Sequence, residues 1–287
     1  MGISSALGPA HEIALSSGRI RYHDTGTGSP VVFVHGLLVN ADLWRGVVPG
    51  VAAAGHRCLT PDWPLGSHSI PVPDADLTPT GLADLIAEFL DALDLTDVTI
   101  VANDTGGALT QILMTRRPER IGRVVLAAVD CYEIWPQPFT TLLKIAKIPG
   151  TIAPLLAPMR WRFAQRLPLG FGWLTKHDLP QEIVESFLQP ARRSAAIRAD
   201  LRRFAATADK GCTLSAAEHF AEVDLPVLVV WSTEDKLFPM SLAERLVAEL
   251  PRATLRTVDN SYTFLSEDRP ELLTELIVEF TRLHAAP

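Results

Sequence analysis

Apolar residues follow two alternating patterns along this chain. Continuous runs at residues 30–34, 98–102, 123–129 and 226–231 are apolar on both faces, which is typical of central strands in a parallel sheet. Residues 80–93 instead repeat apolar side chains at a spacing of three and four, as an amphipathic helix packed on a sheet does. The alternation predicts an α/β fold with a mostly parallel sheet and right-handed crossovers.

Weaker patterns complete the expected order of elements. We expect an opening β-hairpin at 11–15 and 19–24, further strands at 57–62 and 253–258, and further helices at 43–54, 108–117, 240–250 and 270–283.

The alternation stops over residues 131–223, which are first rich in proline and then helical, with basic patches at 160–166 and 192–203. We interpret 131–223 as a helical cap, or lid, inserted into a core domain made of residues 1–130 and 224–287. Because α/β sheets bind ligands at the carboxyl ends of their strands, an insertion at that edge would cover the site.

The sequence Asn-Asp-Thr-Gly-Gly at residues 103–107 joins the apolar run 98–102 to a helical pattern. The chain therefore passes abruptly from a strand into a helix at Asp104, and the small Gly106 and Gly107 permit strand and helix to approach closely. A side chain on such a turn is lifted off the end of the sheet. Asp104 is thus the leading candidate for a chemically active residue.

Composition narrows the class of function. The net charge of −7, without a long run of Lys or Arg, argues against nucleic acid or a membrane surface as the main partner and favours a small-molecule substrate. No apolar run is long enough to span a membrane, and the first residues lack the pattern of a secretion signal. We therefore expect a cytoplasmic protein, either a monomer or a homodimer.

The three cysteines, Cys58, Cys131 and Cys212, are far apart and form no Cys-x-x-Cys or Cys/His cluster. Neither a disulfide framework nor a zinc site is indicated. We expect buried, reduced thiols, no metal and no other cofactor.

Four motifs together resemble the α/β-hydrolase superfamily over nearly the whole chain. They are His35-Gly36 after the third strand, the turn at 103–107, the loop 231–235 after the seventh strand, and residues 264–270 before the last helix. The resemblance implies an eight-stranded, mostly parallel sheet flanked by helices. Within the superfamily, an aspartate followed by x-Gly-Gly is similar to the haloalkane dehalogenase and epoxide hydrolase branch, which attacks carbon with a carboxylate.

This resemblance implies a role for several residues. Asp104 corresponds to the nucleophile, whose carboxylate is ionised at neutral pH and can attack sp³ carbon without first losing a proton. Asp235 matches the acid that supports the catalytic histidine, and Asp130 is the reserve for that acid. The backbone N–H groups of Leu37 and Thr105 match the oxyanion hole.

The chain departs from the family pattern at the catalytic histidine. Aligning residues 264–270 with the family puts Thr263 at the histidine position, and no histidine lies between His219 and His284. A threonine hydroxyl has no pKa near neutrality, so it cannot be the general base that hydrolyses an ester of Asp104.

Other side chains are candidates for substrate binding, namely His35 in the oxyanion motif and Tyr132 and Trp135 at the start of the insertion. His68 lies in the loop after the fourth strand, where we interpret it as a solvent-exposed histidine rather than a base. Thr105 stands where the dehalogenases carry the tryptophan that holds the departing halide. The halide site of those enzymes is therefore not evident in this sequence.

Two hypotheses follow. The first is a hydrolase that acts on a small organic molecule through a covalent ester of Asp104, with an atypical or absent base. The second is a non-hydrolytic protein with the same pocket, either a ligand-binding protein or a lyase or isomerase that uses Asp104 as an acid–base group. The intact turn favours the first and the missing histidine favours the second, and the fold alone does not decide between them.

Overall fold

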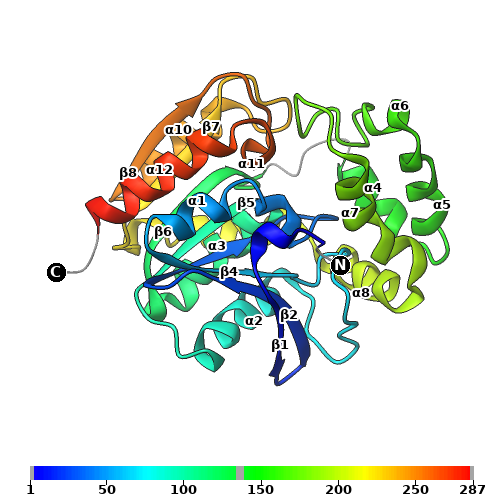
Figure 1. Ribbon diagram of the computed structural model, residues 1–287, viewed down its shortest axis with the longest axis horizontal. Coiled ribbons are helices and arrows are strands. Elements are labelled where there is room, and N and C mark those ends of the chain that lie inside the picture. Colours follow the sequence, from blue (N-terminus) through cyan, green and yellow to red (C-terminus); the bar gives the residue numbers. More distant parts are fainter. Residues whose placement is uncertain (1–2, 134–138, 285–287) are drawn as a thin grey trace.

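Eight strands form a single sheet in the computed structural model, which describes residues 3–133 and 139–284 (Figure 1). The strands lie in the order β1-β2-β4-β3-β5-β6-β7-β8; β1 with β2 and β2 with β4 are antiparallel, and the other neighbours are parallel. Their bounds are β1 Ala10–Leu15, β2 Gly18–Thr25, β3 Ser29–Val34, β4 His56–Pro61, β5 Val98–Asp104, β6 Ile121–Val129, β7 Val227–Ser232 and β8 Ala253–Val258. The predicted hairpin and the mostly parallel, eight-stranded sheet are confirmed.

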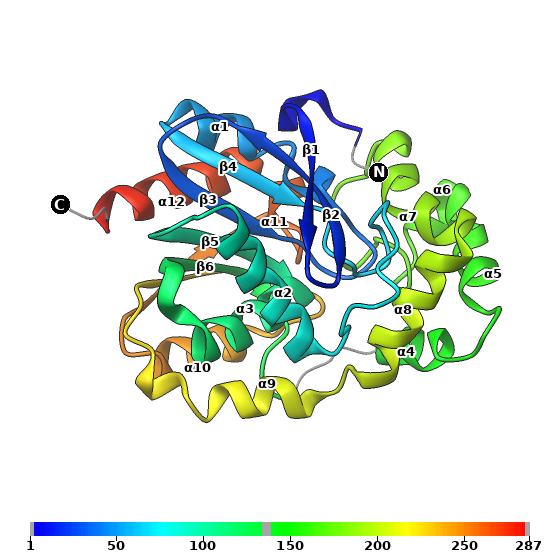
Figure 2. The ribbon, with the colours of Figure 1, turned by 90° about the horizontal axis from the view of Figure 1, so that it is seen from below.

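Helices cover both faces of the sheet, as crossovers between parallel strands require. In Figure 2, α1 and α12 lie on one face, and α2, α3 and α10 lie on the other. The bounds of these helices and of the short α11 are α1 Val48–Ala53, α2 Pro79–Ala92, α3 Thr105–Arg116, α10 Met240–Glu249, α11 Leu265–Asp268 and α12 Pro270–Leu283. The α/β fold class is thus confirmed, with a core packed between two helical layers.

One predicted helix of the core is shorter than expected. The segment 43–54 divides into a 3₁₀ turn, Ala41–Trp44, and α1. Pro49 explains the division, because proline lacks an N–H and is accepted only in the first turn of a helix, which is where it lies in α1.

Helices α4 to α9 lie between β6 and β7. Their bounds are α4 Phe139–Ala146, α5 Ile152–Leu156, α6 Arg162–Gln165, α7 Gln181–Arg193, α8 Ala195–Thr207 and α9 Lys210–Ala217. In both views α4 to α8 gather beside the sheet (Figures 1 and 2), whereas α9 packs against α3 of the core. We call α4 to α9 the insertion.

Buried polar contacts join the insertion to the loops that follow β3 and β4. Asn40 donates through Nδ2 to the carbonyl oxygen of Ser186 in α7, at 3.0 Å. His68 lies 3.1 Å, Nε2 to Oδ2, from Asp200 in α8. The interpretation of His68 as solvent-exposed is wrong, because α8 covers the loop and leaves only 2% of the residue exposed.

The cysteines and the helix lengths bear on two further expectations. All three cysteines are free thiols, and Cys58 and Cys131 are buried as predicted, but Cys212 in α9 is only half-buried because α9 lies at the surface of the core.

Within residues 3–133 and 139–284, no helix is both long and apolar enough to cross a bilayer.

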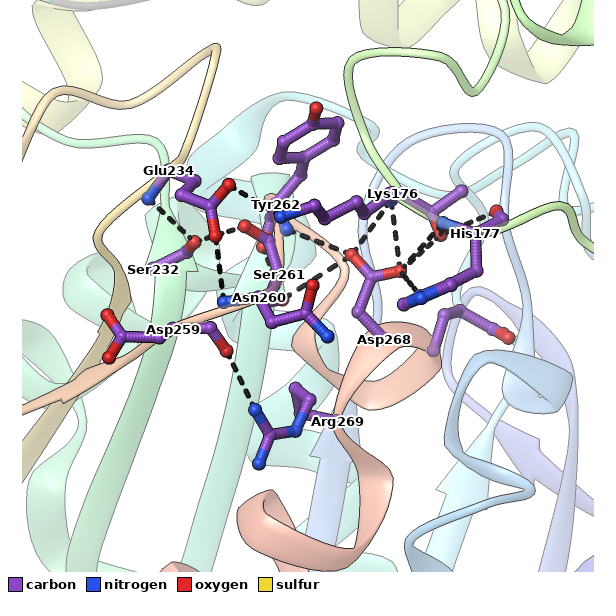
Figure 3. Close-up of polar contacts among 12 residues, drawn as sticks. Lys176, His177, Ser232, Glu234, Asp259, Asn260, Ser261, Tyr262, Asp268 and Arg269 are labelled. Atoms are coloured by element: carbon purple, nitrogen blue, oxygen red, sulfur yellow. Dashed lines mark hydrogen bonds and ion pairs between the residues drawn. The ribbon is translucent and has the colours of Figure 1, made fainter.

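Asp268, the last residue of α11, links the insertion to the loop after β8 (Figure 3). Its side chain is fully buried. On the insertion side it accepts hydrogen bonds from Thr175 Oγ1 at 2.7 Å and from the backbone N–H groups of Lys176 and His177 at 2.9 and 3.1 Å. On the core side it accepts a bond from the N–H of Tyr262 at 2.9 Å. One carboxylate therefore holds two chain segments about 90 residues apart.

We expect Asp268→Ala to lower the free energy of unfolding by about 3 kcal/mol, because several buried donors lose their common acceptor. A urea titration monitored by circular dichroism measures the change. Asp259→Ala is the matched control, since Asp259 lies exposed in the same loop and its loss is expected to change stability by no more than about 0.5 kcal/mol. Equal losses in the two variants would contradict the linking role of Asp268.

Candidate active site

Asp104 occupies a strained turn between β5 and α3. Its φ of 54° and ψ of −133° lie in a region that L residues rarely adopt. The surrounding glycines show why the strain is tolerated: a Cβ on Gly106 would lie 2.3 Å from the carbonyl oxygen of Val34, and one on Gly107 would lie 2.1 Å from Cγ1 of Val129. Only glycine permits strand and helix to pack this closely, and the packing holds the turn.

Two backbone N–H groups point at the carboxylate of Asp104. The N–H of Leu37, in the loop after β3, donates to Oδ2 at 3.3 Å, and the N–H of Thr105 also bonds the carboxylate. A Cβ on Gly36 would lie 2.1 Å from the same Oδ2, so glycine is needed for this loop to approach. The two residues expected to form an oxyanion hole are thus the two whose N–H groups contact the carboxylate.

Burial raises the pKa of Asp104 to about 6. The N–H groups of Thr105 and Leu37 oppose the rise because they stabilise the charged form, and the nearby negative charge of Asp235 adds to it. The carboxylate is therefore mostly ionised at neutral pH, but it holds a proton more readily than an exposed aspartate.

Asp235 and Thr263 form a hydrogen-bonded pair beside Asp104. Thr263 donates through Oγ1 to Oδ1 of Asp235 at 3.0 Å, and the N–H groups of Leu237 and Phe238 donate to the same oxygen at 2.8 and 2.9 Å. Burial raises the pKa of Asp235 to about 6. Oδ2 of Asp235 is buried and has no hydrogen-bond partner in the described part of the chain. Asp235 and Thr263, which the alignment singled out, are therefore in contact, and Oδ2 of Asp235 accepts no hydrogen bond from the described residues.

Asn103 joins the turn directly to the loop that carries Thr263. It donates through Nδ2 to the carbonyl oxygen of Thr263 at 2.8 Å and to that of Ala127 in β6 at 2.5 Å. The sequence patterns predict no role for Asn103. Its position at the end of a buried apolar strand could have indicated a role in hydrogen bonding, because a buried polar side chain needs partners.

Asp130, the reserve acid, contacts the turn on its other side. It accepts a hydrogen bond through Oδ2 from Thr105 Oγ1 at 2.9 Å. Burial raises the pKa of Asp130 well above its usual range, and the negative charge of Asp104 contributes. No hydrogen bond joins Asp130 to Thr263 among the described residues, so Thr263 is held by Asp235 and not by Asp130.

Two of the three candidates for substrate binding, His35 and Tyr132, lie in described parts of the chain. His35 donates through Nδ1 to the carbonyl oxygen of Gly36 and accepts through Nε2 from the N–H of Trp63. Burial lowers the pKa of His35 to about 4, so its ring is neutral at pH 7 and both nitrogens bind backbone. The ring of Tyr132 packs against Arg245 and Phe220. Trp135 lies outside the described residues.

A cavity of about 240 Å³ adjoins this site. Leu37 and Leu38 of the core form one side, and the insertion supplies most of the rest, including Leu156, Phe171 and Leu188. Every side chain that lines it is apolar. Because Leu37 also donates its N–H to Asp104, the cavity and the carboxylate share a wall. The described residues contain no group of three or more His, Cys, Asp or Glu that could hold a metal ion.

Comparisons with known proteins give consistent results. A family model described as alpha/beta hydrolase fold matches residues 29–270. A haloalkane dehalogenase 2 of Mycobacterium bovis is 27% identical over 278 residues, which cover 92% of each chain. A haloalkane dehalogenase of Mesorhizobium japonicum is 35% identical over 126 residues, a stretch that covers 43% of this chain and 40% of that relative.

The fold also matches solved structures. The crystal structure of the haloalkane dehalogenase DatA from Agrobacterium tumefaciens superposes with a TM-score of 0.79 and 23% identity, over 98% of this chain and 100% of the other. At this level of identity the likeness establishes the fold.

The raised pKa of Asp104 predicts a pH-dependent stability. Since the folded-state pKa of about 6 exceeds the unfolded value of about 4, the folded chain retains a proton that the unfolded chain loses between these values. Stability therefore falls as pH rises through this window. We expect Asp104→Asn to gain stability relative to the natural chain by about 2 kcal/mol more at pH 7.5 than at pH 4. Denaturant titrations at both pH values measure this, and a pH-independent difference would contradict it.

Proposed function

This chain belongs to the alpha/beta hydrolase fold family, and from that premise we propose that it is a dehalogenase-like hydrolase in which Asp104 attacks a small apolar substrate. One observation carries the proposal: the N–H group of Leu37 contacts the carboxylate oxygen of a strained, partly buried aspartate. A carboxylate that only capped a helix would need neither the strain nor this second loop. Apart from its contact with the N–H of Thr105, the Asp104 side chain forms no capping hydrogen bond to α3.

In the first half-reaction, an ionised oxygen of Asp104 attacks an sp³ carbon of the substrate. A carbon–oxygen bond forms as the bond to the leaving group breaks, and the leaving group departs with the electron pair. The product is an alkyl ester of Asp104. Because the pKa of Asp104 is raised to about 6, this step is expected to proceed at neutral pH and to slow in acid.

In the second half-reaction, water attacks the carboxyl carbon of that ester. Negative charge then develops on an oxygen of Asp104 itself, and the N–H groups of Leu37 and Thr105 already contact this carboxylate. The proton of the attacking water needs an acceptor. Thr263 is no base, and we propose that the carboxylate of Asp235, held by Thr263, orients the water and takes its proton. The ester C–O bond then breaks, the leaving alkoxide takes that proton and departs as an alcohol, and the carboxyl group of Asp104 loses a proton to solvent.

Ester hydrolysis is accordingly the slow step of the proposed cycle. A general base usually accelerates such a step by about 10²–10⁴-fold. Without a histidine at position 263, the ester on Asp104 should accumulate rather than turn over quickly.

The proposal includes the arrangement of the chain around the site. Residues 131–223 act as a cap over a core made of 1–130 and 224–287, and the apolar cavity beneath the insertion selects apolar substrates. A cytoplasmic location and a monomeric or homodimeric state remain predictions from the sequence.

A non-hydrolytic role is the second candidate. The observation that favours it is the pair of raised pKa values, about 6 for both Asp104 and Asp235. Carboxyl groups with such values can give and take protons near neutrality, as a lyase or isomerase requires.

Covalent labelling separates the two candidates. The protein is incubated with alkyl halides, epoxides and activated esters, and peptide mass spectrometry locates any added mass. We expect label on the peptide that contains Asp104 and none in Asp104→Asn. Asp97→Asn is the matched control, because Asp97 precedes the other end of β5 and also has a positive φ, 51° against 54°. If no reagent labels Asp104, the nucleophile proposal is abandoned in favour of the acid–base or binding role.

The missing base can be restored. We expect Thr263→His to release the label about a hundredfold faster than the natural chain, because a histidine supported by Asp235 can activate water. Release is followed by mass spectrometry after excess reagent is removed. Thr263→Val is the control, since it removes the hydroxyl and adds no base. Equal release by the histidine and valine variants would show that the rest of the site is not arranged for ester hydrolysis.

A further inference from the structure

One segment of the insertion has a charge opposite to that of the whole protein. The chain has a net charge of −7, yet residues 139–177 contain no Asp or Glu. The same segment carries six basic residues: Lys144, Lys147, Arg160, Arg162, Arg166 and Lys176. This segregation makes the segment locally cationic although the whole chain is acidic.

The same segment exposes large apolar side chains. Between residues 161 and 169, the exposed fractions are 47% for Trp161, 67% for Phe163, 49% for Leu167 and 44% for Leu169. The rings of Trp161 and Phe163 stack with centroids 6.1 Å apart. Isolated exposed apolar residues are ordinary, but several within nine residues mark an interaction surface. We call residues 160–169 the docking face.

Charged side chains of the docking face are available to a partner. The guanidinium of Arg160 lies 4.2 Å from the centroid of the Trp161 ring. Arg166 is paired with Asp178. Neither Arg160 nor Arg162 forms an ion pair within the described part of the chain. The face therefore combines two arginines that form no such ion pair with aromatic and aliphatic side chains, although Arg162 lies near enough to Asp178 to help lower its pKa.

The docking face is continuous with the apolar cavity. Phe163, Leu167 and Leu169 are exposed at the surface and also line the cavity, whose opposite side includes Leu37. An apolar molecule that moves from this surface into the cavity would contact only apolar side chains, as far as Leu37, whose N–H contacts Asp104.

We propose that the docking face binds the surface of an anionic lipid bilayer, from which apolar molecules enter the cavity. Arginines beside exposed Trp, Phe and Leu are the combination that lies at a lipid headgroup boundary. Residues 192–203 are also basic, but the exposed Trp161, Phe163, Leu167 and Leu169 lie on the docking face, which is why we assign the membrane contact to it. The binding does not depend on the chemistry of Asp104.

Other occupants fit the face less well. A symmetric second copy would bring Arg160 and Arg162 toward the same residues of its partner, which like charges oppose. Nucleic acid would satisfy the arginines but not the exposed Leu167 and Leu169. The net charge of the chain argued against a membrane surface, whereas the local charge of residues 139–177 favours one.

Vesicle sedimentation with the full chain tests the proposal. We expect the protein to pellet with phosphatidylglycerol vesicles at low salt, and to remain in solution with phosphatidylcholine vesicles. Arg162→Glu should weaken the binding at least about tenfold, since each basic residue near an anionic surface contributes measurably and the substitution reverses the charge. Arg256→Glu is the matched control, because Arg256 is also exposed and forms no ion pair in the described part of the chain. It should bind as the natural chain does.

Trp161→Ser tests the apolar part of the face without touching the cavity, whose lining does not include Trp161. It should also weaken binding to phosphatidylglycerol vesicles, and all three variants should keep the natural thermal unfolding midpoint. The proposal is overturned if the natural chain fails to pellet with anionic vesicles, or if Arg256→Glu weakens binding as much as Arg162→Glu. It is overturned equally if light scattering shows a dimer that Trp161→Ser dissociates while vesicle binding is unchanged.

Discussion

The close packing around Asp104 is the constraint on which the rest of the site depends. Gly36, Gly106 and Gly107 each lie where a single added carbon would overlap a neighbour, so the loop after β3, strand β5 and helix α3 meet with no spare room. That packing imposes the positive φ of Asp104 and brings the N–H of Leu37 to its carboxylate. It also shields the carboxylate partly from water, and this desolvation is the main reason why the pKa of Asp104 rises.

Thr263 is held in place from two sides. It is fully buried, its hydroxyl holds Asp235, and its carbonyl oxygen is held by Asn103. The side chain that this network fixes beside Asp235 is a hydroxyl, which has no pKa near neutrality. A buried carboxylate oxygen without a partner is energetically unfavourable, and such groups are concentrated at sites of function.

The sequence predicts the order of strands and helices better than it predicts the surroundings of individual side chains. Strand and helix periodicity located the sheet, and the turn at Asp104 was recognisable because a strand, small residues and a helix are adjacent in the chain. Local patterns could not show that α8 buries His68, since Asp200 is 132 residues away. The net charge of the whole chain was similarly misleading about binding to an anionic surface. It is negative, but residues 139–177 carry a positive charge that the total conceals. Pro49 was visible, but the extent of the helix around it depended on tertiary packing.

The carboxylate of Asp268 also bears on how the molecule can open. It bonds residues 175–177 of the insertion and the N–H of Tyr262, which directly precedes Thr263. The insertion therefore cannot swing away from the core at this point without displacing the residue that holds Asp235 or breaking a buried network. Small molecules that enter the cavity past its exposed residues Phe163, Leu167 and Leu169 would leave that network intact. Asp268 therefore acts as a fixed point of attachment about which any movement of the insertion must turn.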